Sequence, residues 1–264
     1  MKITMLSWRA FQLAAVSILC SSWCLAQSQT ATPTKIQVTM YQIKPDMVGE
    51  WEQFIKGESN EAARKAGIPM RSHWQTAVLG QGMRYTRVQT LGNFAALDEP
   101  SPLVKAIGQA EVDQLNAKAR KMFLAAPHTW VLQLRADMSF PQELSEQHRR
   151  IAVLNHIKVM PGRGAEFERL MKTEIIPAMR KADVNGYQVY ENLVSADPNE
   201  WHTVTYYNRF ADFDREAPLL RALGQEGYRK LNAKTAGLIH TMEREVIRYR
   251  DDLSFMPAPQ RASR

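Results

Sequence analysis

The residues best suited to chemistry are histidines and a tyrosine on strand-like segments in the second half of the chain. His202 and Tyr206 lie four residues apart in the run Trp201–Phe210, so on a strand both side chains point to one face. His156 lies in a second strand-like run, Ile151–Val159. Because imidazole changes its charge near neutral pH, these three residues are the predicted catalytic group, with histidine acting as acid or base.

Aromatic and polar side chains near this group are the predicted ligand contacts. We expect them to line a cleft between the sheet and the helices of the second half, which would bind a small apolar or aromatic molecule. The alternative is that the tyrosines and tryptophans are core residues with their polar tips at the rim. The predicted contacts are Asn155, Tyr190, Trp201, Arg209 and His73.

The sequence predicts no metal site and no cofactor. It contains no HxxxH or HExxH spacing, and both cysteines, Cys20 and Cys24, come before residue 27. A tetrahedral zinc site would therefore need histidines and carboxylates from scattered positions. The GxSxG, P-loop and GxGxxG motifs are also absent.

The first 26 residues have the organisation of a secretory signal peptide. Lys2 and Arg9 form a basic start, the apolar run Ala10–Leu19 follows, and small residues stand at Cys24 and Ala26. The apolar run is shorter than the ~20 residues that a membrane span needs. We therefore expect a periplasmic or secreted protein without a membrane span in its mature part. An uncleaved membrane anchor is the alternative.

The charge of the chain does not indicate a nucleic-acid partner. The formal net charge is +7, and loss of the two basic residues of the signal peptide leaves +5, spread along the chain. No arginine run, zinc-finger or helix-turn-helix signature accompanies it.

One stretch of the chain occurs twice. Pro102–Lys118 returns as Pro218–Lys234 with nine of seventeen positions identical, at an offset of 116 residues. Both copies keep a glycine inside the predicted helix, Gly108 and Gly224. Because a glycine in a helix costs ~1 kcal/mol relative to alanine, its retention predicts a close backbone contact at this position. The pattern identifies an internal duplication.

Hydrophobic periodicity gives both copies the order β-α-β-β-α-β. Pro177 falls within the first predicted helix of the second copy and is expected to kink or split it. The predicted boundaries are a polar lead-in at 27–34, a first repeat at 35–140, a linker at 141–149, a second repeat at 150–255 and a disordered tail at 256–264. Both repeats end in one signature, Arg135-Ala-Asp137-Met-Ser139 and Arg250-Asp-Asp252-Leu-Ser254. We expect these residues to share one side of a strand, where they would pin strand ends by ion pairs or contact the other repeat.

Two tandem ferredoxin-like repeats of this element order resemble the dimeric α+β barrel superfamily. Its members include the antibiotic-biosynthesis monooxygenase-like, NIPSNAP-like, EthD-like and chlorite-dismutase-like families. The resemblance covers 35–255 and implies an α+β fold in which the two repeats pair their sheets into one barrel-like domain. A four-stranded sheet covered by helices on one side needs such a partner for its other face. The candidate sheet residues for this core are Val38, Met40, Val88, Val131, Val153, Ile157, Val204 and Ile247. Comparison with haem-binding relatives would make His156 a candidate axial ligand.

Three functions follow from these observations. The first is an exported small-molecule-binding protein with its pocket in the second repeat. The second is a cofactor-independent monooxygenase or isomerase of the kind that this fold hosts, motivated by the histidines and Tyr206. The third is a structural module without a ligand. A homo-oligomer is compatible with all three.

Overall fold

A computed structural model describes residues 35–141, 150–194 and 197–256. The predicted signal peptide, the lead-in, nearly all of the predicted linker and most of the predicted tail lie outside the described residues. Within the described part of the chain, no helix is long and apolar enough to cross a bilayer.

The described residues form strands and helices in the order that the periodicity predicts. The strands are β1 (Lys35–Gln42), β2 (Arg71–Thr76), β3 (Arg84–Leu91), β4 (His128–Leu134), β5 (Ile151–Val159), β6 (Gly186–Val194), β7 (Glu200–Tyr207) and β8 (Ile239–Tyr249). The α-helices are α1 (Val48–Phe54), α2 (Asn60–Lys65), α3 (Pro102–Ile107), α4 (Gln109–Met122), α5 (Gly164–Leu170), α6 (Ile176–Lys181) and α7 (Pro218–Ala236). Short 3-10 turns span Pro45–Met47, Phe94–Leu97, Ala136–Met138, Phe210–Asp214 and Asp251–Leu253.

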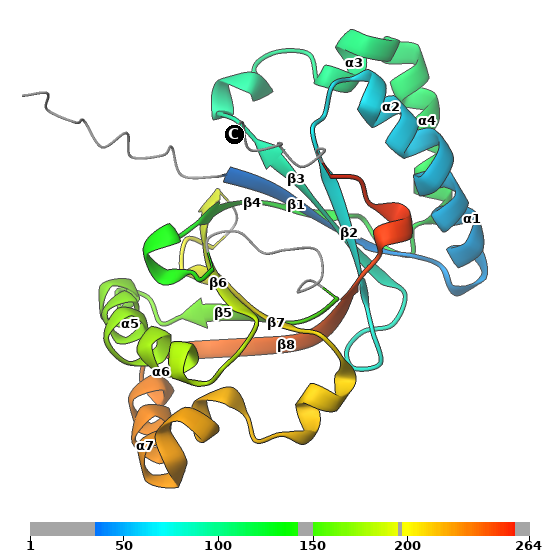
Figure 1. The fold of residues 1–264 in the computed structure, drawn as a ribbon. Helices are drawn as coiled ribbons and strands as arrows, with labels where there is room; N and C mark the ends of the chain where they lie inside the picture. Colours follow the sequence, from blue (N-terminus) through cyan, green and yellow to red (C-terminus); the bar gives the residue numbers. More distant parts are fainter. Residues whose placement is uncertain (1–34, 142–149, 195–196, 257–264) are drawn as a thin grey trace, which may run out of the picture. The chain divides into compact units, whose positions relative to one another are not determined.

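The strands close into one barrel in the order β1-β3-β2-β8-β5-β7-β6-β4 (Figure 1). Neighbouring strands are antiparallel throughout. Strands of the first half run β4-β1-β3-β2 and those of the second half β8-β5-β7-β6, and the halves join at β2–β8 and β4–β6. Closure gives each of the described strands a neighbour on both sides, so the sheet has no open edge within the described residues.

The helices lie outside the barrel in two groups, α1–α4 and α5–α7 (Figure 1). Trp51 and Phe54 of α1 pack on Tyr41 of β1 and Tyr85 of β3. In the second half, α5 and its continuation pack on Trp201 of β7. Each helix group therefore covers the outer face of its own half of the sheet.

The opposite face of each strand points into the barrel. Val38, Met40, Val88, Val204 and Ile247, which the alternation predicts for the sheet core, all line the interior. Three other candidates do not, because their register places them on the outer face: Ile157 packs in the helix-side core, Val153 lines a cavity under α7, and Val131 alternates with the inward Trp130 and Leu132.

The two glycines that both copies of the repeated stretch share do not mark a close backbone contact. An added Cβ at Gly108 or Gly224 would meet no atom within 4 Å. Their φ angles are +81° and +66°, and both break the helix: α3 ends before Gly108, and α7 is kinked at Gly224. The expectation of close backbone approach is wrong, because the glycines are needed for a backbone conformation that other residues rarely adopt.

Replacing Gly108 with alanine is expected to destabilise the protein by roughly 1–3 kcal/mol, because a Cβ is strained at this φ and ψ. Gly57→Ala is the matched control. Gly57 lies in a helical turn with free space around its Cα, so alanine there should be neutral or stabilising by roughly 0.5–1 kcal/mol. Urea unfolding of both variants measures the difference, and equal effects would contradict the assignment.

A π-helical turn interrupts the first helix of each half. It spans Ile55–Ser59 between α1 and α2, and Met171–Ile175 between α5 and α6. Pro177 follows the second turn, at the start of α6, so the sequence-based expectation of a split helix is met. The π-helical turn of the first half forms without a proline. The feature that the two halves share is therefore the π-helical turn itself, with its one extra residue, and not the proline.

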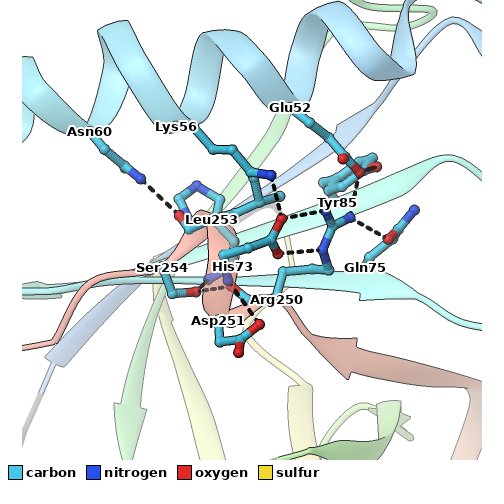
Figure 2. A network of polar contacts seen from close by, with 11 residues as sticks. Glu52, Lys56, Asn60, His73, Gln75, Tyr85, Arg250, Asp251, Leu253 and Ser254 are labelled. Atoms are coloured by element: carbon cyan, nitrogen blue, oxygen red, sulfur yellow. Dashed lines mark hydrogen bonds and ion pairs between the residues drawn. The ribbon is translucent and has the colours of Figure 1, made fainter.

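The closing signature of each half forms a polar network rather than one side of a strand. Arg250 lies just after β8, and Asp252 lies in the 3-10 turn that follows, which contradicts the predicted strand. The Arg250 guanidinium bonds both carboxylate oxygens of Asp252 at 2.8 and 2.9 Å, the amide oxygen of Gln75 at 2.8 Å and the carboxylate of Glu52 (Figure 2). Lys56 pairs with Asp252 at 2.7 Å.

The same contacts occur in the other half. Arg135 bonds Asp137 at 3.0 and 3.1 Å and Glu168 at 2.5 Å, and Lys172 pairs with both carboxylates at 2.8 and 2.7 Å. Each arginine therefore contacts the first helix of the opposite half. Both predicted roles are present, because each arginine pairs with an aspartate just past the end of its strand and also reaches the opposite half of the barrel.

Replacing Arg250 with glutamine is expected to lower the free energy of unfolding by roughly 1–3 kcal/mol, since Glu52 would lose a charged partner in a partly buried place. Arg209→Gln is the control, because Arg209 pairs with Asp212 while 78% exposed, and such pairs contribute roughly 0–1 kcal/mol. Chemical denaturation compares the two. Equal losses would show that the network does not join the halves.

Candidate functional site

A cavity of about 290 Å³ lies inside the barrel. This volume is at the low end for small-molecule sites. Its walls are largely apolar, with Trp74, Trp130 and Leu132 among them. The polar groups are few and come mainly from β5, β6 and β7: His156, Gln188, Tyr190, His202 and Tyr206. An apolar cavity with a few convergent polar groups is the usual form of a binding site.

Two histidines and a glutamate form a hydrogen-bonded chain at this cavity. His156 of β5 and His202 of β7 are direct cross-strand partners. Their Nδ1 atoms lie 3.0 Å apart, and Nε2 of His156 lies 3.2 Å from Oε1 of Glu245 on β8. Glu245 also accepts bonds from Thr76 at 3.1 Å and Arg84 at 2.9 Å. Three neighbouring strands thus align one carboxylate and two imidazoles.

The direction of this chain follows from the charge of Glu245. Burial raises the pKa of the Glu245 carboxyl, but the hydrogen bond from His156 and the charge of Arg84 outweigh it, so the pKa is lowered overall and the group is ionised. A carboxylate only accepts hydrogen bonds, so Nε2 of His156 donates to it. When His156 is uncharged, its Nδ1 accepts from Nδ1 of His202. Nε2 of His202 consequently carries a lone pair.

That nitrogen has no hydrogen-bond partner among the described residues. His202 is 3% exposed, and burial lowers its pKa to about 3. The imidazole is therefore neutral at neutral pH. Nε2 itself is covered in the cavity wall, so a substrate reaches it only after a side-chain rearrangement.

Gln188 of β6 organises the other polar part of the cavity. Its Oε1 accepts hydrogen bonds from the hydroxyls of Tyr206 at 2.7 Å and Tyr190 at 2.8 Å. The Tyr206 hydroxyl therefore donates to Gln188, and its predicted acid–base role stays a prediction.

The predicted site residues fall into two groups. His156, His202, Tyr206 and Tyr190 line the same cavity. This cavity lies inside the barrel and not between the sheet and the helices, and both halves line it, so the predicted location in the second repeat alone is wrong. Sequence alternation determines which residues share a face, but it does not show which face is turned toward the helices.

The other four predicted contacts lie elsewhere because they occupy outward registers or a loop. Trp201 packs on Phe167 under α5. His73 is fully buried on the outer face of β2. Asn155 bonds Arg244 at 2.8 Å beside a cavity of about 400 Å³ under α7. Arg209 is exposed and lines a third cavity at the ends of β7 and β8.

His156 is not free to act as the axial haem ligand that the comparison with haem-binding relatives suggested. Both ring nitrogens of His156 are engaged by Glu245 and His202, so the histidine compared with an axial ligand has none to offer. None of the residues lining the cavity is a lysine or arginine that could pair with propionates. Among the described residues, no group of three or more histidines and carboxylates has the arrangement of a metal site.

Three residues of this candidate site were missed from the sequence: Glu245, Gln188 and Trp130. The signal for Glu245 was its spacing from Ile247, a predicted core residue on the same strand face. Gln188 likewise shares a face with Tyr190. Trp130 contacts both histidine rings, with centroid distances of 6.0 and 5.9 Å, which only barrel closure brings about.

Comparisons with known proteins show similarity in structure but not in sequence. No family model matches the chain, and no curated protein matches it. An anthrone oxidase-like protein superposes with a TM-score of 0.61 at 7% identity, covering 89% of this chain and 98% of its own. A candidate monooxygenase of Fusobacterium nucleatum gives 0.57 at 11% identity, covering 83% and 93%. A candidate monooxygenase of Lactobacillus acidophilus gives 0.54 at 13% identity, covering 85% and 97%.

Identities this low carry information on the fold alone. The neighbours share the closed antiparallel barrel with helices on its outside, and they include a candidate chlorite dismutase at a TM-score of 0.52 and 10% identity, covering 84% of this chain and 96% of its own. The chain accordingly shares its fold, a closed antiparallel barrel with helices outside, with these solved structures.

Proposed function

We propose that this protein is a cofactor-independent enzyme of the monooxygenase type, which binds a small apolar or aromatic molecule inside the barrel and removes a proton from one of its carbon atoms. The observation that carries the proposal is the chain from Glu245 through His156 to His202, which ends in an unpartnered nitrogen at an apolar cavity. This arrangement is that of a general base oriented by a second group.

The proton would pass to Nε2 of His202 as the C–H bond breaks, and the electron pair stays on the substrate carbon. The positive charge that forms is compensated through His156 by the carboxylate of Glu245, which is held in place by Thr76 and Arg84. In a low-dielectric cavity such a prearranged charge stabilises the ion pair more than water would.

Dioxygen is the required co-reactant. The carbanion adds to O₂ to give a peroxide, which takes up a proton and eliminates water to leave a carbonyl group. A CH₂ group and O₂ thus become C=O and H₂O, with carbon losing four electrons and dioxygen gaining four. The resemblance in fold to an anthrone oxidase-like protein and to candidate monooxygenases supports this class of reaction without specifying a substrate.

Anthrone, a tricyclic ketone with an acidic CH₂ group, is a suitable probe. The folded protein is expected to raise the rate of O₂ uptake and of anthraquinone formation above that of the same protein unfolded by heat, with one O₂ consumed per anthraquinone. Equal rates would reject an oxygenase acting on this class of compound. A binding protein that performs no chemistry would then be the remaining function of the cavity.

We also propose that residues 35–140 and 150–255 are tandem ferredoxin-like repeats. The equivalent strand orders of the two halves, the paired glycines and the two arginine networks support this. Export is a further proposal, based on the sequence of the first 26 residues. Mass spectrometry of the protein from its own host should find a mature N-terminus at Gln27, and a retained Met1 would contradict a cleaved signal peptide.

A further inference from the structure

We propose that Gln188 binds the carbonyl oxygen of the substrate through its side-chain amide, and that the substrate is a small apolar ketone with an acidic C–H bond close to the carbonyl group. This rests on the proton abstraction proposed above and assigns the other half of the same site. It makes Gln188 a catalytic residue and gives Tyr190 and Tyr206 the role of holding it in place.

The hydrogen bonds of Gln188 leave one part of its amide available. Oε1 accepts both tyrosine hydroxyls, at 2.7 and 2.8 Å, so it has no lone pair left for a ligand. The Nε2 group still has two N–H donors. Gln188 is 8% exposed and lines the cavity, so these donors lie in apolar surroundings. A donor in such a place is expected to bind an acceptor on the ligand.

The two tyrosines also make Gln188 a stronger donor. Two O–H groups at the amide oxygen draw electron density toward it, and hydrogen bonds in such chains strengthen one another. They fix the rotamer of Gln188 as well, so the amide is oriented before the substrate arrives. Fixed donors aimed at a developing negative charge are the usual means by which enzymes stabilise an enolate oxygen.

The position of Gln188 relative to His202 suits a ketone. Gln188 is paired with Val204, and Tyr190 with His202, so Gln188 and His202 are diagonal neighbours on adjacent strands. Such neighbours lie roughly 7–8 Å apart at the backbone, and both of these side chains point into the cavity. One molecule can therefore place a carbonyl oxygen at Gln188 and a nearby C–H bond at His202. Removal of that proton moves charge onto the oxygen that Gln188 binds.

The test uses two bicyclic probes of similar shape, 2-tetralone and tetralin, which differ by the carbonyl group. Binding is followed by the fluorescence of Trp74 and Trp130, which line the cavity. We expect 2-tetralone to bind more tightly than tetralin to the natural protein. Gln188→Glu keeps an acceptor for both tyrosine hydroxyls but removes the amide donors. In this variant the affinity for 2-tetralone should fall about tenfold, and that for tetralin should stay the same.

Proton exchange at C1 of 2-tetralone in D₂O, measured by NMR without dioxygen, separates this inference from the proposed function. Gln188→Glu should slow the exchange roughly 10²–10³-fold, as loss of an oxyanion donor does elsewhere. Tyr190→Phe, which removes one of the two supporting hydroxyls and keeps Gln188, should have a smaller effect in the same direction.

Equal binding of both probes by the natural protein, or unchanged 2-tetralone binding by Gln188→Glu, overturns the role of Gln188, even if exchange still depends on His202. If the natural protein selects 2-tetralone through Gln188 but does not accelerate exchange, the recognition of a carbonyl stands and the proposed proton abstraction fails. Failure of 2-tetralone to bind at all overturns the ketone assignment.

Discussion

Replacing His202 with glutamine is expected to slow the exchange of the C1 protons of 2-tetralone by roughly 10²–10⁴-fold, the usual contribution of a general base. Glutamine can still donate a hydrogen bond to Nδ1 of His156, so the neighbouring histidine stays in place, but it has no basic nitrogen. NMR in D₂O without dioxygen measures the exchange directly, independently of any later reaction with O₂.

His240→Gln is the matched control, because His240 lies on the exposed part of β8 and does not line the cavity. This variant should exchange the C1 protons of 2-tetralone at the rate of the natural protein. The pH dependence gives a second check. Since the pKa of His202 is lowered to about 3, the base stays neutral, and the protein-dependent rate should be constant between pH 8 and pH 6. If the protein-dependent exchange rate instead fell to half its value near pH 6.5, the base would be an ordinary exposed histidine.

Acid is expected to destabilise the protein well above the pH at which carboxylates titrate. Burial lowers the pKa of His73 to about 3, assisted by the charges of Arg87 and Arg71, and His202 has a similar value. Both titrate near pH 6.5 in the unfolded chain, which therefore binds more protons below that pH. Stability is complete above pH 6.5 and falls as the pH is lowered toward 3.

Each of the two histidines should contribute roughly 2 kcal/mol to the loss between pH 8 and pH 5, at ~1.4 kcal/mol per pH unit below pH 6.5. The carboxylates with lowered pKa values, such as Asp137 and Glu168, lose their contribution only at lower pH. Urea unfolding at both pH values measures the loss. In His73→Gln the loss of unfolding free energy between pH 8 and pH 5 should be about half that of the natural protein, whatever the stability of the variant at pH 8. In His240→Gln this loss should equal that of the natural protein. A full loss in His73→Gln would contradict the assignment.

The sequence was sufficient for the order of elements, because that order is recorded in local periodicity. Apolar residues alternate in the strands and recur every three or four positions in the helices, and glycine and proline mark the turns. The same alternation placed His202 and Tyr206 on one face of β7. Local signals failed where a feature depends on backbone dihedrals, as at Gly108, whose role is a positive φ and not a close contact.

What only the tertiary structure decided is the direction in which those faces point and which strands meet. His156 and His202 are 46 residues apart, and Glu245 is 89 residues from His156, yet pairing of β5 with both β7 and β8 brings them into one hydrogen-bonded chain. Trp130, from the other half, reaches both histidines only because β4 and β6 close the barrel. Strand register and closure depend on contacts over the whole chain, so a strand's own sequence shows which side chains share a face, and the fold determines that this face encloses a cavity.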